Sequence, residues 1–270
     1  MKRIVVGCAA LAAGCALTSP APGGPLHPTT YTQIEPSFGI AYGPASADLN
    51  GVRVTGDGQS KIVTSPIDPF PNPVPVTVGV RQQLGRQFEA SADVGWVDSG
   101  VRVRMRAPSR ASAPIVLSAG ARTGRVSALG DDTYQGQIAF EIYPQISPIH
   151  HPTLRLVLSL GLIAGSFEHQ ILLPSSYAEV LAGPGLKDSP VVSVVRREVR
   201  LSSAMGVTGE REHLGFTLAL VPWILLAAAE PSSMGCLACN AQETVTNFSQ
   251  SWGLALLFVP SAGWVGIECR

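Results

Sequence analysis

The sequence predicts an all-β protein, namely a closed antiparallel transmembrane β-barrel of about ten strands, with 8–12 possible. Three observations support this prediction. Apolar residues alternate with small or polar ones along many segments, charged residues are scarce, and no apolar run of helix-spanning length follows the first 15 residues. Only 14% of the 270 residues are charged, whereas 46% are hydrophobic. Soluble domains carry about 25% charged residues, so part of this surface needs an apolar environment.

Alternation with period two defines the candidate strands. In the segment Leu154–Leu162, leucine occupies every second position, and Phe88–Trp96 and Trp252–Phe258 alternate in the same way. An even number of strands is typical of single-chain bacterial outer-membrane barrels. The ten predicted strands span residues 33–43, 74–84, 86–97, 100–107, 113–124, 134–144, 153–167, 191–206, 213–228 and 248–259.

The two faces of these strands differ in side-chain size. Large aliphatic and aromatic residues form one row, and Gly, Ala, Ser and Thr dominate the other. Small side chains suit a crowded barrel interior, while large ones suit lipid. Charged residues in the row of small side chains are expected to face the lumen and to form ion pairs there. Alternatively, they lie on the solvent-exposed face of a soluble β-sandwich. They are Glu89, Asp93, Arg102, Arg104, Glu141, Arg155 and Arg200. Aromatic residues at expected strand ends are predicted to form an interfacial girdle: Tyr42, Trp96, Tyr134, Tyr143, Trp223 and Trp252.

The lengths of the connections give the barrel an orientation. The long connections 44–73, 168–190 and 229–247 all fall at one end, and alternate connections are short. Outer-membrane barrels have short periplasmic turns and longer external loops, so we expect the first strand to start on the periplasmic side. Pro222 interrupts a predicted strand and fits a bulge or an earlier strand end. Residues 261–270 are either a tail or the end of the last strand.

The N-terminal segment carries a targeting signal. Lys2 and Arg3 precede a short apolar run, which is typical of a signal peptide over residues 1–14. The segment Leu11-Ala12-Ala13-Gly14-Cys15 resembles the bacterial lipoprotein lipobox. This resemblance implies that Cys15 is lipidated and becomes the mature N-terminus, unless the signal peptide is an ordinary one and Cys15 is incidental.

The resemblance also implies a destination. Residue 16 is Ala and not the Asp of the inner-membrane retention signal, which implies the outer membrane and a periplasmic, lipid-anchored N-terminus. Residues 15–30 are rich in Pro, Gly and Thr and are expected to form a flexible tether. Residues 31–260 would then form the barrel. The expected partners are membrane lipid, the barrel-assembly machinery and the lipoprotein-sorting machinery.

Two of the cysteines suggest a disulfide within a loop. Cys236 and Cys239 are close in sequence within the last predicted external loop, and cysteines outside the cytosol tend to oxidise. A local disulfide is therefore expected. A zinc site would need further ligands, and His213 is expected at the opposite membrane face. Cys269 is either free or paired with one of the other two.

One set of residues raises the question of catalysis. Ser166, Glu168 and His169 lie close in sequence at an expected barrel rim. A serine, a histidine and a carboxylate at a barrel rim resemble the set found in outer-membrane lipid hydrolases. Sequence proximity does not supply the geometry that nucleophilic catalysis requires. We therefore predict no catalytic site, no metal and no cofactor.

These observations predict an outer-membrane β-barrel lipoprotein of structural, adhesive or narrow-passage type. Two alternatives stay open: a lipid-tethered soluble sandwich or lipocalin-like protein that binds an apolar ligand, and a lipid hydrolase. Nucleic-acid binding is not expected, because 19 basic residues balance 19 acidic ones.

Overall fold

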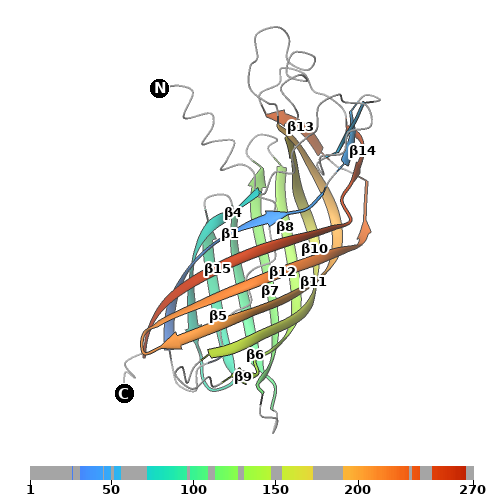
Figure 1. The fold of residues 1–270 in the computed structure, drawn as a ribbon. Coiled ribbons are helices and arrows are strands. Elements are labelled where there is room, and N and C mark those ends of the chain that lie inside the picture. The colour runs from blue at the N-terminus through green and yellow to red at the C-terminus, as the bar shows by residue number, and fades with distance from the viewer. Residues whose placement is uncertain are drawn as a thin grey trace, which may run out of the picture.

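The structure is a computed structural model that describes residues 26, 31–44, 46–49, 52–55, 72–95, 98–108, 113–126, 131–146, 154–172, 191–230, 233–237 and 245–265. Ten strands pair antiparallel, each with its neighbour, in a closed ring (Figure 1). The ring is closed because the first strand pairs with the last and β10 pairs with β11. The predicted all-β, ten-stranded closed barrel is confirmed.

The ten barrel strands follow the chain in order around the ring. Each overlaps one predicted strand, with boundaries that differ by a few residues at most ends. They are β1 (Tyr31–Tyr42), β4 (Asn72–Gln83), β5 (Phe88–Gly95), β6 (Asp98–Arg106), β7 (Ile115–Val126), β8 (Asp131–Ile142), β10 (Leu154–Leu172), β11 (Val191–Arg211), β12 (Leu214–Ala228) and β15 (Trp252–Val265). Within the described residues, no helix is long and apolar enough to cross a membrane.

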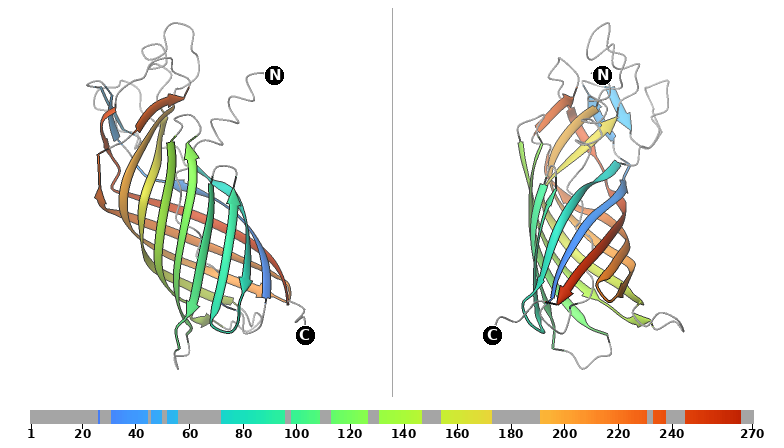
Figure 2. Two further views of the ribbon diagram at one scale, coloured as in Figure 1. Left: turned by 180° about the vertical axis from the view of Figure 1, so that it is seen from behind. Right: turned by 90° about the vertical axis from the view of Figure 1, so that its left-hand side faces the viewer.

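Five short strands lie outside the ring, four of them in segments predicted only as loops. β2 (Ser46–Leu49), β3 (Val52–Thr55) and β14 (Val245–Ser249) form a separate three-stranded sheet. β13 (Ser233–Leu237) pairs with the first residues of β11, and β9 (Gln145–Ile146) pairs with the start of β10. β13 and β14 lie together at one end of the barrel, in both views of Figure 2 as well as in Figure 1. We call this the loop end and the opposite one the turn end.

β10 and β11 extend beyond their neighbours at the loop end. They stay paired without interruption from Leu154↔Gly209 to Leu172↔Val191. The pairing of β10 with β8 ends earlier, at Gly165↔Gln135. The last residues of β10 therefore project past β8, and this longer pair carries β13.

Two local features explain points that the sequence left open. Pro222 lies in β12 where the ladder with β11 has a gap between Ser202↔Trp223 and Met205↔Leu220, so its missing N–H costs no bond to β11. β15 continues through Pro260 to Val265, and Val265 pairs with Tyr31. Residues 261–265 are therefore the end of the last strand, and β1 starts beside it at the turn end.

An apolar surface surrounds the ring. Leu158, Leu160 and Leu162 of β10 are 41–54% exposed, whereas Val157, just before them, and Ile163, just after them, are at most 1% exposed. Every barrel strand carries at least one exposed large apolar residue: Ile34, Val76, Phe88, Val101, Leu117, Ile138, Leu160, Met205, Leu218 and Leu256 are examples. We call this surface the outer belt.

Exposed aromatic residues border the outer belt. Trp252 and Trp264 face outward near the two ends of β15. They are twelve positions apart, which is about 40 Å along the strand and roughly 28 Å along the axis at a tilt near 45°. An outer-membrane apolar band is about 25 Å tall. Tyr42 lies against Trp252, with 5.8 Å between ring centroids.

The predicted aromatic girdle was wrong at two positions. Tyr143 is fully buried, and Trp223 lies on the inward row of β12 with Ala219 and Val221. Both lie an even number of positions from inward-facing residues of the same segment. The alternation of the strand therefore turns them inward, although they lie near a strand end. Tyr134 is 53% exposed, and Trp96 lies outside the described residues.

We predict that two glycines in the same strand pair differ sharply in their tolerance of a methyl group. A Cβ on Gly161 of β10 would lie 2.5 Å from the carbonyl oxygen of Ile138, whereas one on Gly136 of β8 meets nothing closer than 3.9 Å. Gly161→Ala should lower the free energy of unfolding by about 1–3 kcal/mol, and Gly136→Ala should change it by less than about 1 kcal/mol. Urea unfolding in detergent measures both, and equal effects would contradict the register.

Candidate functional site: the barrel lumen

Buried ionic groups line the lumen in three places. Alternation sends every second residue of each strand inward, where polar side chains must find partners because water is scarce. One network lies near the turn end, a smaller cluster lies above it, and a third network lies at the loop end.

The turn-end network is centred on Arg104 of β6, which is 1% exposed. Its guanidinium donates to Glu89 at 2.8 Å and to Glu141 at 2.9 Å. It also donates to the Tyr143 hydroxyl at 2.6 Å, and that hydroxyl in turn donates to Glu141. Arg104 therefore joins β5, β6 and β8 across the lumen side of the wall.

Arg81 extends this network to the first two barrel strands. It lies 3.7 Å from Glu89 and also pairs with Glu35 of β1. Arg81 donates a further hydrogen bond to Gln33. The turn-end network thus consists of Glu35, Arg81, Glu89, Arg104, Glu141 and Tyr143, and it connects five strands from β1 to β8.

A second cluster lies closer to the loop end, on β5 to β7. Arg122 pairs with Asp93 at 2.6 Å and with Asp98 at 2.9 Å. A small cavity adjoins it, lined by Asp93, Arg102, Arg122, Gln135 and Gln137 among others. Five of its eight lining residues carry polar or charged side chains.

The loop-end network is built around Glu198 of β11, whose side chain is fully buried. One carboxylate oxygen accepts from Arg196 Nε at 2.7 Å and lies 2.7 Å from His169 Nε2. The other accepts from Arg200 Nε, also at 2.7 Å. Arg200 lies between two aromatic rings, 3.6 Å from the centroid of Phe167 and 3.9 Å from that of Trp223.

Arg196 connects this network to the small outer sheet. It donates to the carbonyl oxygen of Phe248 in β14 at 3.0 Å and to that of Gln250 at 3.2 Å. The Phe248 ring lies 4.7 Å from the Arg196 guanidinium and 4.6 Å from the His169 ring. The loop-end network, defined as His169, Arg196, Glu198, Arg200 and Phe248, therefore ties β14 to the barrel.

The seven charged residues expected in the lumen occupy different parts of it. Glu89, Arg104 and Glu141 come together in the turn-end network. Asp93 pairs with Arg122, and Arg200 belongs to the loop-end network. The remaining two are only half-buried: Arg102 lines the small cavity beside Arg122, and Arg155 lies at the turn end in register with Thr208.

The residues considered for catalysis are not brought together. Ser166 and His169 lie three positions apart on β10, so they fall on opposite rows of the strand. His169 instead lies beside Glu198 and Arg200 through its Nε2 atom. The structure therefore gives His169 a place in an ionic network, and the serine–histidine arrangement of a hydrolase is absent from this part of the described chain.

The cysteine predictions lie mostly outside the described residues. Cys236 is in β13, and its backbone is in register with Val192 of β11. Cys15, Cys239 and Cys269 are not among the described residues. His213 is exposed in the turn between β11 and β12, at the opposite end of the barrel from β13. Among the described residues, no group of three or more His, Cys, Asp or Glu is placed to hold a metal ion.

Sequence reasoning missed several members of the networks. Arg196 and Glu198 share the parity of Arg200, and Tyr143 shares that of Glu141. The period-two pattern alone could have placed them inward. Contacts such as Arg81 with Glu89 depend on strand register, which has no local signal in the sequence.

Comparison with known proteins gives only structural alignments with low scores and low sequence identity. No family model and no curated protein matches the chain. Among solved structures, the outer membrane protease OmpT from Escherichia coli aligns with a TM-score of 0.41 and 10% identity, covering 89% of this chain and 97% of that one. The translocator domain of autotransporter NalP from Neisseria meningitidis aligns with a TM-score of 0.23 and 8% identity, covering 97% and 93%. The fold assignment rests on the strand pairing described above.

We predict that Arg104→Met destabilises the barrel strongly. The change leaves two buried carboxylates without their shared cation, which should lower the free energy of unfolding by about 3–5 kcal/mol. Neutralising them in the triple variant Arg104→Met/Glu89→Gln/Glu141→Gln should recover part of the loss. Exposed Arg211 gives the matched control, Arg211→Met, with an effect within about 0.5 kcal/mol. Urea unfolding in detergent measures the series, and similar values for Arg104→Met and Arg211→Met would disprove the role of Arg104.

We also predict that Arg196 holds β14 in place. Arg196→Gln removes the charged donor to two backbone carbonyls, so β14 should open more often, and cleavage by added protease near β14 should accelerate by about tenfold or more. Arg197→Gln, an exposed neighbour on the opposite row, is the control and should leave the rate unchanged. Timed proteolysis with mass spectrometry measures it. Equal rates for the two variants would show that the contact is not needed.

Proposed function

We propose that this protein is an outer-membrane β-barrel with a closed lumen that serves a structural or adhesive role. The observation that carries the proposal is the outer belt, which surrounds all ten strands and has aromatic residues near both ends of β15. A soluble protein rarely exposes so large an apolar surface. A lipid bilayer supplies the environment that this surface needs.

The interior favours a closed barrel over a wide pore. Ion pairs connect inward-facing side chains near both ends of the lumen, and several of these side chains are almost completely buried. A ten-stranded barrel is only slightly wider than the eight-stranded barrels that side chains fill. Any passage would therefore be narrow, and display of the loop-end segments is the better-supported role.

Orientation and attachment complete the proposal. The turn end is assigned to the periplasm and the loop end to the cell exterior, because outer-membrane barrels place their longer loops outside. Lipidation at Cys15 would add a second attachment to the membrane. Insertion would then depend on the barrel-assembly machinery and lipid attachment on the lipoprotein-sorting machinery.

The alternatives receive less support from the geometry. A lipocalin-like ligand carrier would combine an apolar interior with a polar exterior, and here the outer row is the more apolar one. A hydrolase would need a nucleophile facing His169. The Nε2 atom of His169 instead shares a hydrogen bond with Glu198.

The outer belt can be tested with one charge. Ile138 is 64% exposed in the middle of β8. In lipid vesicles, Ile138→Arg should lower the free energy of unfolding by about 2–4 kcal/mol, because the side chain then faces hydrocarbon. Ile138→Val is the control and should change it by much less. A soluble barrel would instead tolerate the exposed arginine to within about 0.5 kcal/mol.

Detergent extraction tests the membrane location, and conductance measurements test the closed lumen. Cys15→Ser protein should still require detergent for extraction and should shift in gel mobility on heating, because the belt alone holds it in the membrane. In planar bilayers, wild-type protein should show no large steady conductance. Full solubility without detergent would reject the membrane location, and a large open channel would reject the closed lumen.

A further inference from the structure

Two arginines lie beside a buried hydrophobic cluster inside the turn end of the barrel. The cluster, which we call the Leu26 cluster, consists of Leu26, Val116, Tyr143 and Val157, all at most 3% exposed. Arg106 of β6 is in register with Val116 of β7. Arg155 of β10 lies two positions before Val157, on the same inward row. Both arginines therefore face the lumen at the same end, next to one cluster.

Neither of these arginines forms an ion pair within the part of the chain that the structure describes. The basic residues that do so are Arg81, Arg104, Arg122, His169, Arg196 and Arg200. The carboxylates of Glu89 and Glu141 both bind Arg104. Glu210, an inward residue near the turn end of β11, interacts electrostatically with Tyr31. The charges of Arg106 and Arg155 are therefore not balanced by these carboxylates.

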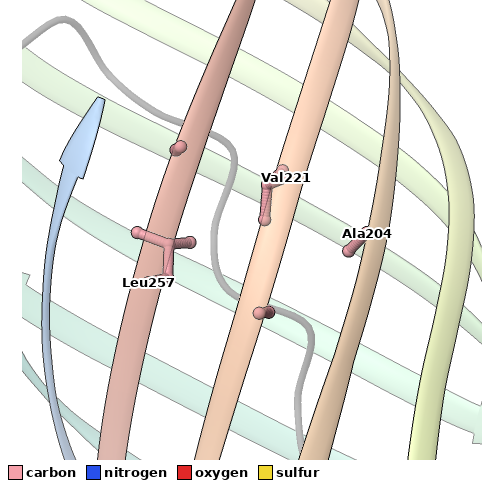
Figure 3. Packing of buried hydrophobic residues seen from close by; sticks show 5 residues of the cluster. Ala204, Val221 and Leu257 are labelled. Carbon is pink, nitrogen blue, oxygen red and sulfur yellow. The ribbon is translucent and has the colours of Figure 1, made fainter. Parts of the chain in front are cut away.

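The inner wall on the other side of Arg155 carries no charge to balance it. In register across β11, β12 and β15, Arg155 is followed by Thr208, Thr217 and Val259. Further toward the loop end, the same three strands carry a patch of small apolar residues that are 1–5% exposed (Figure 3). The patch consists of Ala204, Ala219, Val221, Ala255 and Leu257. A counter-ion for Arg155 must therefore come from elsewhere.

The guanidinium group of Arg106 is held in place but incompletely bonded. Its Nη2 atom donates to the carbonyl oxygen of Leu26 at 2.7 Å. Its Nε atom is buried and has no hydrogen-bond partner among the described residues. Arg155 and Arg104 both repel it electrostatically. A partly buried cation with an unused donor and cationic neighbours is costly, and a bound anion would remove both penalties.

We propose that Arg106 and Arg155 form a binding site for a small free oxyanion, a phosphate or a carboxylate, inside the turn end. The planar fork of a guanidinium matches the oxygens of these groups, and such charge-assisted hydrogen bonds are strong. Both side chains are only half-buried, so a solute can reach them. They face the lumen and not the outer belt, which favours a free anion over a lipid headgroup. This binding role is separate from the display role proposed above.

Calorimetric titration of inorganic phosphate into the full chain in detergent tests the site. Wild-type protein should bind phosphate saturably, and Arg155→Gln should bind it about tenfold or more weakly, because one charge-assisted hydrogen bond is lost. Arg211→Gln removes the same charge from an exposed position at the turn end and should bind as wild type does. No saturable binding by wild-type protein, or equal affinities of the two variants, would overturn the proposal. The assay needs only the folded barrel, so its failure is distinguishable from failure of the membrane location.

Arginine modification gives a second test that needs no variant. Phenylglyoxal reacts with accessible guanidinium groups, and peptide mass spectrometry follows each arginine separately. At about ten times its Kd, phosphate should slow the modification of Arg106 and Arg155 about tenfold and leave the exposed Arg86 and Arg211 unchanged. Equal slowing at all four arginines, or none at any, would overturn the proposal.

Lipid vesicles distinguish the source of the anion. In phosphate-free buffer, vesicles of phosphatidylglycerol should modify the reaction of Arg106 and Arg155 with phenylglyoxal no more than vesicles of phosphatidylcholine do. Protection of both arginines by phosphatidylglycerol would overturn the assignment to a free anion and would point to a lipid headgroup instead.

Discussion

The pairing of β1 with β15 is the interaction on which the other features depend. It runs from Tyr31↔Val265 to Tyr42↔Leu254 and removes the two free edges that an open sheet would have. Closure gives the sheet an inside and an outside. Every strand must then place one row of side chains in each environment, and a shift of one residue in any strand would exchange the two rows.

Closure also explains how so many charges can be buried. An isolated ion inside a protein is costly, and a buried pair is tolerated only when each group is well bonded. Arg104 meets this condition through two carboxylates and a hydroxyl, all on strands held at fixed spacing. The networks are thus a consequence of the wall that positions them. They contribute to specifying the register, because a slipped strand would separate the partners.

Prediction from the sequence succeeded where one strand alone carried the signal. The leucines of Leu154–Leu162 show their orientation without reference to any neighbour, and the ten strands were found in this way. Prediction failed where the answer depended on strand register, and where nearness to a strand end was given more weight than the inward–outward alternation. Tyr143 and Trp223 were assigned to the membrane interface because they lie near strand ends, yet their parity placed them inside. Leu26 has no periodic context, and only the folded barrel shows what it contacts.

The two ionic networks differ in what they hold together. The turn-end network joins strands that belong to the ring, so it stiffens a structure that backbone pairing already defines. The loop-end network binds β14, which has no ladder to the ring and pairs only with β2 among the described strands. The bonds from Arg196 to Phe248 and Gln250 therefore attach an element that backbone pairing to the ring leaves unattached. A barrel that displays its loop end needs such an attachment, since loop-end segments joined only through their flanking chain would take many positions and present no constant surface.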